Sequence, residues 1–152
     1  MDQKALARKN LERRLGPLRG TSPPVPQRGW LKAIRESLGM TTTQFARRLG
    51  VTQPRIIALE KAESNGTASM NTLREAAEAM NCTLVYAVVP TEPLDKLLRD
   101  QAARKAALDL ARLDHTMRLE DQALSKADLD AERQRMIDNL LSGSLRGLWD
   151  DE

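Results

Sequence analysis

The chain has 152 residues, of which 41% are hydrophobic but only 3% aromatic, so its core must be mostly aliphatic, a composition that favours packed helices. One Cys, one His and no apolar run near the roughly 20 residues of a membrane span exclude an intramolecular disulfide, a metal cluster and a transmembrane helix, and we expect a cytoplasmic protein. The formal net charge of +3 conceals thirteen Lys and Arg against four Asp and Glu in residues 1–62, which predicts a polyanion such as nucleic acid as partner.

Residues 1–16 are predicted to form a basic amphipathic helix. Leu6, Leu11 and Leu15 recur near helical spacing among Lys and Arg. Residues 17–29 contain four of the seven prolines and are predicted to be an extended linker. Whether the N-terminal helix contacts DNA, a dimer mate or another partner stays open at this stage.

Residues 30–81 carry the signals of four short helices. Apolar side chains recur one turn apart in the first helix, at Trp30, Ile34 and Leu38. The fourth is predicted over residues 70–80. The ends are marked by capping residues: Thr41 with Gln44 in capping-box spacing, Thr52 and Ser69 at N-termini, and Gly39 and Gly50 at C-termini.

The second and third of these helices fit a helix-turn-helix. A small residue, Ala46, lets two helices cross closely, and Gly50 admits the positive φ of a sharp turn. Eight positions match the pattern: Met40, Phe45, Ala46, Leu49, Gly50, Val51, Ile56 and Leu59. The pattern resembles the repressor-type (XRE) helix-turn-helix family. Over about residues 30–80, this resemblance implies a five-helix-like DNA-binding fold whose second motif helix enters the major groove.

The resemblance also implies the residues that contact DNA. Gln53 matches the position that reads adenine, Arg55 can bind a phosphate or guanine, and the expected base-reading set is Gln53, Pro54, Arg55, Ile57 and Ala58. The candidate phosphate contacts are Thr42, Thr52, Arg47, Arg48, Lys61 and Ser69. Thr42 departs from the family, which commonly has a Gln there that contacts phosphate and braces the reading Gln. A helical hairpin used only for protein contact is the alternative.

Residues 82–90 are predicted to form one short β-strand that mediates dimerisation. The run "TLVYAVV" is β-branched and apolar, and Pro90 ends it. A lone strand in a helical chain must pair with a second copy, a partner protein or an unrecognised segment. The residues expected in the dimer strand are Leu84, Val85, Tyr86 and Val88.

Residues 91–152 are predicted to be a helical extension. Its first helix follows an apolar seam over residues 94–113, which "DHTMRLEDQ" continues or breaks, and its second begins after Ser125 and ends at Gly143. The expected fold is therefore mainly α, with a repressor-like helix-turn-helix domain, one short β-strand and a C-terminal helical extension.

A closer resemblance covers most of the chain. The order of the basic helix, the proline-rich linker, "RGWLKAIRESLGMT", "LGVTQPRI", "CTLVYAVVP" and "HTMRLEDQ" is similar to the mobile mystery protein A family. That resemblance implies an antitoxin-like regulator encoded beside a Fic-domain protein. Fic enzymes are commonly inhibited by a helix with Ser or Thr, three residues, Glu, then Gly or Asn, a pattern that Thr116 and Glu120 fit but Asp121 does not. A solvated helix or a dimer face is the alternative for this segment.

The expected function is that of a regulator. We expect a homodimeric, sequence-specific autorepressor that binds an inverted-repeat operator, and the alternative is an antitoxin that inhibits a Fic-domain partner by direct contact. The sequence contains no Gly-rich phosphate loop, nucleophile elbow or metal-ligand spacing, so no enzyme activity, catalytic residue or cofactor is expected.

Overall fold

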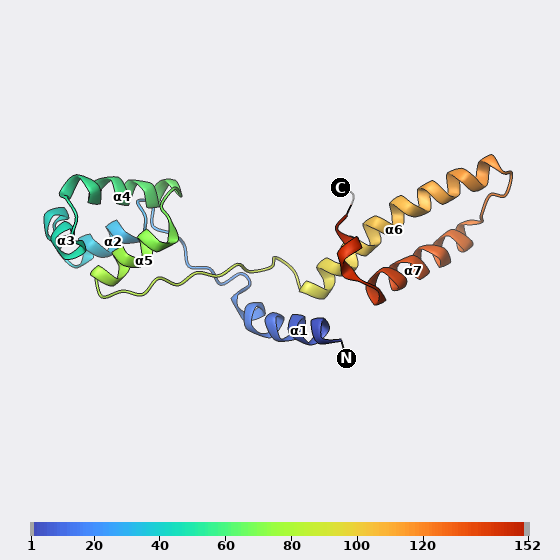
Figure 1. The fold of residues 1–152 in the computed structure, drawn as a ribbon, viewed down its shortest axis with the longest axis horizontal. Coiled ribbons are helices and arrows are strands. Elements are labelled where there is room, and N and C mark those ends of the chain that lie inside the picture. Colours follow the sequence, from blue (N-terminus) through green and yellow to red (C-terminus); the bar gives the residue numbers. More distant parts are fainter. Residues whose placement is uncertain (1, 151–152) are drawn as a thin grey trace. The chain divides into compact units, whose positions relative to one another are not determined.

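The structure, a computed structural model, describes residues 2–150 and divides the chain into two compact units. The central unit is Ser22–Val88, and the terminal unit combines Met1–Thr21 with Val89–Glu152 (Figure 1). Helices dominate both units, which confirms the expectation of a mainly α protein. None of the helices in residues 2–150 combines the length and apolar content that crossing a membrane requires.

The central unit consists of four α-helices, whereas the resemblance implied five. They are α2 (Trp30–Ser37), α3 (Thr42–Leu49), α4 (Gln53–Asn65) and α5 (Met70–Ala79). Helix α3 packs against α4 and α5, and α2 packs against α4. Seven buried side chains form the core: Leu31, Phe45, Ala46, Ile56, Leu59, Ala76 and Met80. The helix-turn-helix pattern therefore identified the residues that hold α3 and α4 together.

Local capping explains where these helices begin and end. Thr41 and Gln44 form a reciprocal capping box, in which Thr41 Oγ1 accepts from the Gln44 amide at 3.1 Å and Gln44 Oε1 accepts from the Thr41 amide at 2.8 Å. Gly50 ends α3 with a φ of 74°. Helix α4 continues through Asn65 because Gly66, in the left-handed conformation, supplies its C-cap.

Two carboxylates of α4 fasten it to α2. Glu60 Oε1 accepts from Arg35 Nε at 2.5 Å and Glu60 Oε2 accepts from Arg35 Nη2 at 3.1 Å, with both side chains buried. Glu63 Oε1 accepts from the amide of Trp30 at 2.7 Å and so caps the N-terminus of α2. A Cβ at Gly29 would lie 2.6 Å from Glu63 Oε2, so this close approach requires glycine.

The terminal unit is built on a helical hairpin. Helices α6 (Leu94–Leu119) and α7 (Lys126–Ser142) run antiparallel (Figure 1), and the short 3₁₀ helix η2 (Leu145–Leu148) packs against both. Helix α6 continues the predicted seam, which buries Ala102, Ala106 and Leu110 on one side. Leu148 is fully buried, and Gln101 Nε2 donates to its carbonyl at 3.1 Å. The tail is therefore anchored through Leu148.

Helix α1 (Gln3–Leu15) and the 3₁₀ helix η1 (Gly16–Leu18) belong to the terminal unit. Arg8 Nε forms an ion pair with Asp95 at 2.6 Å, and Glu12 Oε2 accepts from the amide of Leu94 at 3.1 Å. Arg19 links Glu12 to the carbonyl of Pro90, with distances of 2.7 and 2.9 Å. These contacts hold the N-terminal helix at the start of α6.

The predicted β-strand is not formed in the single chain. Residues 83–89 have no regular secondary structure, and residues 2–150 contain no strand. Side chains in this segment are highly exposed, with 84% for Val85, 67% for Tyr86 and 85% for Val88. A strand needs a hydrogen-bonded neighbour, and no other part of the described chain supplies one. The β-branched residues of this segment favour an extended backbone, but they do not supply the second strand with which it would pair.

Candidate nucleic-acid interface

Helix α4 presents one side to the core and the other to solvent. Ile56 and Leu59 are buried, so the helical period turns the intervening residues outward. All five expected base-reading residues are exposed in the first two turns: Gln53, Pro54, Arg55, Ile57 and Ala58. Pro54 lies in the first turn, where a missing amide hydrogen costs no helical hydrogen bond. Pro54, Ile57, Ala58 and Lys61 recur every three or four residues, whereas Gln53 and Arg55 flank this ridge on its two sides.

The side chain of Gln53 is fixed by a neighbour on α3. Gln53 Nε2 donates to Thr42 Oγ1 at 3.1 Å. A primary amide has two N–H donors and one carbonyl acceptor, so this contact leaves one donor and the acceptor free. That remaining pair matches the major-groove edge of adenine, which accepts at N7 and donates from N6. Thr42 of α3 thus braces the Gln53 amide through this hydrogen bond.

The candidate phosphate contacts lie in different surroundings. The Thr52 hydroxyl makes no capping hydrogen bond and is exposed, as is Lys61 on α4. Ser69 caps α5, because its hydroxyl accepts from the amide of Thr72 at 3.1 Å. Arg48 Nε donates to the carbonyl of Ala79 at 2.7 Å, so Arg48 stabilises the C-terminal end of α5.

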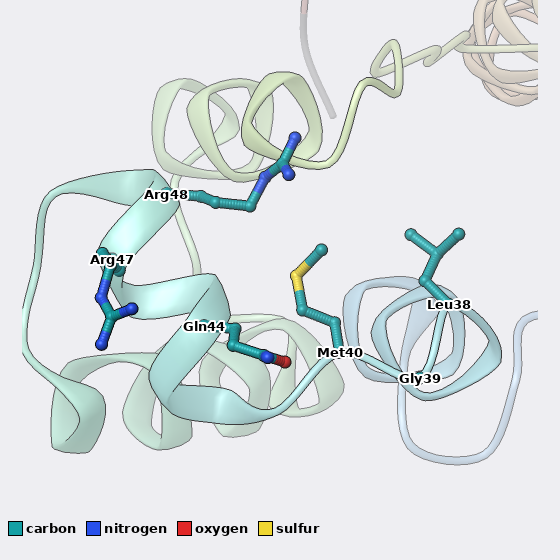
Figure 2. A pocket seen from close by; sticks show the side chains of 6 residues that line it. All are labelled: Leu38, Gly39, Met40, Gln44, Arg47 and Arg48. Atoms are coloured by element: carbon teal, nitrogen blue, oxygen red, sulfur yellow. The ribbon is translucent and has the colours of Figure 1, made fainter.

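An open hollow of about 440 Å³ lies between α3 and the turn that precedes it (Figure 2). Figure 2 shows Arg48 extended toward α5 and Arg47 pointing away from Arg48. The hollow is lined by Leu38, Gly39, Met40, Gln44, Arg47 and Arg48. The two adjacent arginines of α3 therefore both border this hollow, although their side chains extend in different directions.

The exposed surface of α3 and α4 carries almost only positive charge. The two helices contain two carboxylates, Glu60 and Glu63. Glu60 is buried against Arg35, and its hydrogen bonds raise the pKa of the Arg35 guanidinium above its ordinary value. Glu63 is half-buried and engaged with the N-terminus of α2. The exposed surface of α3 and α4 therefore carries cations but no exposed carboxylate of these two helices, which favours binding to phosphates.

Sequence reasoning missed the Arg35–Glu60 pair. Glu60 lies four residues after Ile56 and one after Leu59, so the period that buries those two side chains also turns Glu60 inward. A carboxylate at such a position needs a cationic partner, which is the signal that could have identified the pair. The identity of the partner depends on how α2 packs, which the local pattern does not contain.

The possible Fic-inhibitory residues lie in the terminal unit. Thr116 is in the last turn of α6, where its hydroxyl donates to the carbonyl of Arg112 at 3.0 Å. Glu120 follows the helix as its C-cap, and both side chains are exposed. The next residue, Asp121, has a φ of 56°. In residues 2–150, no group of three or more His, Cys, Asp or Glu side chains is arranged to hold a metal ion.

Comparisons with known proteins agree with this geometry. Neither a curated protein nor a solved structure was found to match the chain. Residues 31–86, which run from the second residue of α2 to beyond the end of α5, match the family model described as helix-turn-helix. The chain therefore contains an XRE-type helix-turn-helix domain, and this domain supports a role as a DNA-binding transcriptional regulator.

Proposed function

We propose that the chain is a sequence-specific repressor that binds an inverted-repeat operator as a homodimer and regulates its own operon. The observation that carries this proposal is the Gln53 amide, exposed at the start of α4 and braced by Thr42 at 3.1 Å. A side chain held in one orientation binds a base more tightly than a mobile one, because less rotamer entropy is lost on binding, and its fixed donor and acceptor match only one base edge.

Three exposed side chains at the start of α4 have corresponding partners on DNA. Gln53 binds adenine through its free donor and acceptor, and Arg55 binds a phosphate or the O6 and N7 of guanine. Ile57, which is 51% exposed, contacts thymine methyl groups. The cations of α3 and α4, with no exposed carboxylate among them, attract the phosphate backbone.

Dimerisation lengthens the DNA site beyond the few base pairs that one reading helix contacts. A single helix-turn-helix reads about four or five base pairs, so two copies related by a two-fold axis read an inverted repeat. Residues 83–88 offer an apolar, extended stretch whose side chains at Val85, Tyr86 and Val88 are exposed. In the dimer this stretch pairs with its symmetry mate as an antiparallel ribbon.

The base-reading assignment is tested by the double variant Gln53→Ala/Arg55→Ala. Two good bidentate contacts are worth about 2–6 kcal/mol together, so operator affinity should fall by roughly 30-fold or more. Affinity for a scrambled duplex should change little if Arg55 binds guanine, and should fall as well if Arg55 binds a phosphate. The matched control is Gln27→Ala/Arg28→Ala, which removes the same two side chains from exposed positions before α2. Binding is measured by titration and footprinting on the DNA upstream of the gene. Equal operator affinity for both variants would refute the assignment.

The dimer is tested at Tyr86. Tyr86→Pro removes a backbone donor and blocks ladder pairing, whereas Tyr86→Phe retains the strand preference. Sedimentation should show a shift to monomer for the proline variant alone. An unchanged dimer in Tyr86→Pro would place the interface elsewhere.

Inhibition of a Fic-domain partner by direct contact is the second candidate. It is favoured by Asp121, whose φ of 56° is the left-handed conformation that the Gly or Asn of the inhibitory motif adopts readily. Glu120→Gln should then release nucleotide transfer by the neighbouring Fic-domain protein, whereas Glu132→Gln on α7 should not. Equal inhibition by both variants would remove Glu120 from this role.

A further inference from the structure

Helix α1 has two sides with different roles. On one side, Arg8 forms its ion pair with Asp95, and Glu12 accepts from the amide of Leu94. Because Arg8 and Glu12 are four residues apart, they share one helical face, and that face is occupied by the start of α6. Another molecule that binds α1 must therefore contact the side of the helix opposite Arg8 and Glu12.

The other side carries an uncompensated group of cations. Lys9, Arg13 and Arg14, which we call the basic end of α1, are exposed and form no ion pair with any carboxylate in residues 2–150. The nearest carboxylate in sequence, Glu12, is occupied by Arg19 at 2.7 Å and by the Leu94 amide at 3.1 Å. These contacts lower the pKa of Glu12, with the hydrogen bond from Arg19 as the largest cause.

Intrahelical effects do not account for the whole group. Cations in the last turn interact favourably with the helix dipole, which explains the positions of Arg13 and Arg14. Lys9 lies before that turn, and its i,i+4 spacing from Arg13 places two like charges side by side, which destabilises a helix. A polyanion bound to this face would turn that repulsion into attraction.

We propose that the basic end of α1 binds the sugar-phosphate backbone of the DNA duplex that α4 reads. This inference rests on the proposed function. Charge complementarity favours DNA: residues 89–152 carry ten Lys and Arg against fourteen Asp and Glu, so most of the terminal unit is repelled by a duplex and α1 supplies its attractive face. From residue 9 to residue 14 a helix rises about 7.5 Å, enough for two or three phosphates.

The covalent connection limits where this contact can occur. Residues 20–29 join α1 and η1 to α2, and ten extended residues span at most about 36 Å. Protection by the basic end is therefore expected on the backbone that flanks the bases that α4 reads, and not at a remote site on the duplex.

The test compares two triple variants of the full chain. Lys9→Ala/Arg13→Ala/Arg14→Ala removes the basic end, and Lys126→Ala/Arg133→Ala/Arg135→Ala removes the same charge from exposed positions of α7. Alanine retains helix propensity, so circular dichroism should stay unchanged in both. Affinity for the upstream duplex and for a scrambled duplex is measured across salt concentrations, and the operator complex is mapped by hydroxyl-radical footprinting.

The expected result is a loss that does not depend on base sequence. Three lost phosphate contacts lower the slope of log affinity against log salt by about 2.7, so the ratio of affinities at about 50 and 200 mM salt falls by roughly 40-fold per protomer. The α7 variant should keep the wild-type slope, and only the α1 variant should lose protection of the flanking backbone.

Other outcomes separate the two proposals. If the two triple variants have equal slopes and footprints while Gln53→Ala/Arg55→Ala still loses the operator, the basic end has no role in DNA binding and the proposed function stands. A change in oligomeric state without a change in slope would assign the basic end to an acidic protein surface and overturn the inference. If the wild-type chain binds neither duplex at low salt, both proposals are wrong.

Discussion

The buried ion pair between α2 and α4 predicts a large difference between two similar substitutions. Arg35 faces two carboxylates: Glu60, which is 6% exposed with an atom at 2.5 Å, and Glu36, whose side chain is 54% exposed with an atom at 3.9 Å. Glu60→Gln leaves a buried cation without a counter-charge, which costs about 3–5 kcal/mol. Glu36→Gln removes a solvated partner and costs about 0–1 kcal/mol. A unit of 67 residues, 22–88, has a free energy of unfolding of roughly 3–10 kcal/mol, so the first change removes a large share.

The assay relies on the presence of one tryptophan in each unit. Trp30 lies in the central unit and Trp149 in the terminal unit, so a Trp149→Phe background reports unfolding of the central unit alone by fluorescence. With a slope of about 1–3 kcal/mol per molar urea, Glu60→Gln should lower the midpoint by at least about 1 M, and Glu36→Gln should barely change it. The pair Arg35→Met/Glu60→Leu should be less destabilised than Glu60→Gln. Equal midpoints for the two Gln variants would show that burial does not control this interaction.

Three further changes test other contacts. Glu63→Ala removes the acceptor of the Trp30 amide and should cost the central unit about 1–2 kcal/mol in the same urea assay, with Glu63→Gln restoring most of it. Because the pKa of Glu12 is lowered from 4.5, its stabilising contact is complete above pH 4.5 and is lost as the pH falls through the lowered value. The protection factor of the Leu94 amide, which corrects for the slower intrinsic exchange in acid, should therefore fall in acid, and Glu12→Gln should remove this dependence. Leu148→Ala should cost the terminal unit about 2–5 kcal/mol and leave the Trp30 signal unchanged.

Features that depend on neighbouring residues could be predicted from the sequence. The capping box joins Thr41 and Gln44, which are three residues apart. The turn at Gly50 depends only on the positive φ of that residue, which is 74°. Burial of Ile56 and Leu59 follows from helical periodicity alone, and their burial in turn fixes which residues of α4 are exposed. The exposure of the expected base-reading residues was predictable for this reason, although no contact with DNA enters that argument.

Features that join distant residues could not be predicted in the same way. Glu60 binds Arg35, which lies 25 residues away in the sequence, and Glu12 accepts from the amide of Leu94, which lies 82 residues away. Periodicity places Glu60 on the buried side of α4, but only the packing of α2 determines its partner. The β-branched residues from Val85 to Val88 likewise prefer an extended conformation, but a strand is a property of two paired segments, and the single chain provides one.

The contacts that orient α4 are separate from the side chains that it exposes. Ile56 and Leu59 bind it to the core, the pair of Glu60 with Arg35 fixes it to α2, and Thr42 holds the amide of Gln53. None of these contacts involves the ridge formed by Pro54, Ile57, Ala58 and Lys61. Substitution of an exposed residue away from such contacts usually changes stability by no more than about 0.5 kcal/mol, whereas a changed base contact alters discrimination by about 1–3 kcal/mol. The side chains of this ridge can therefore be changed at little cost to the fold.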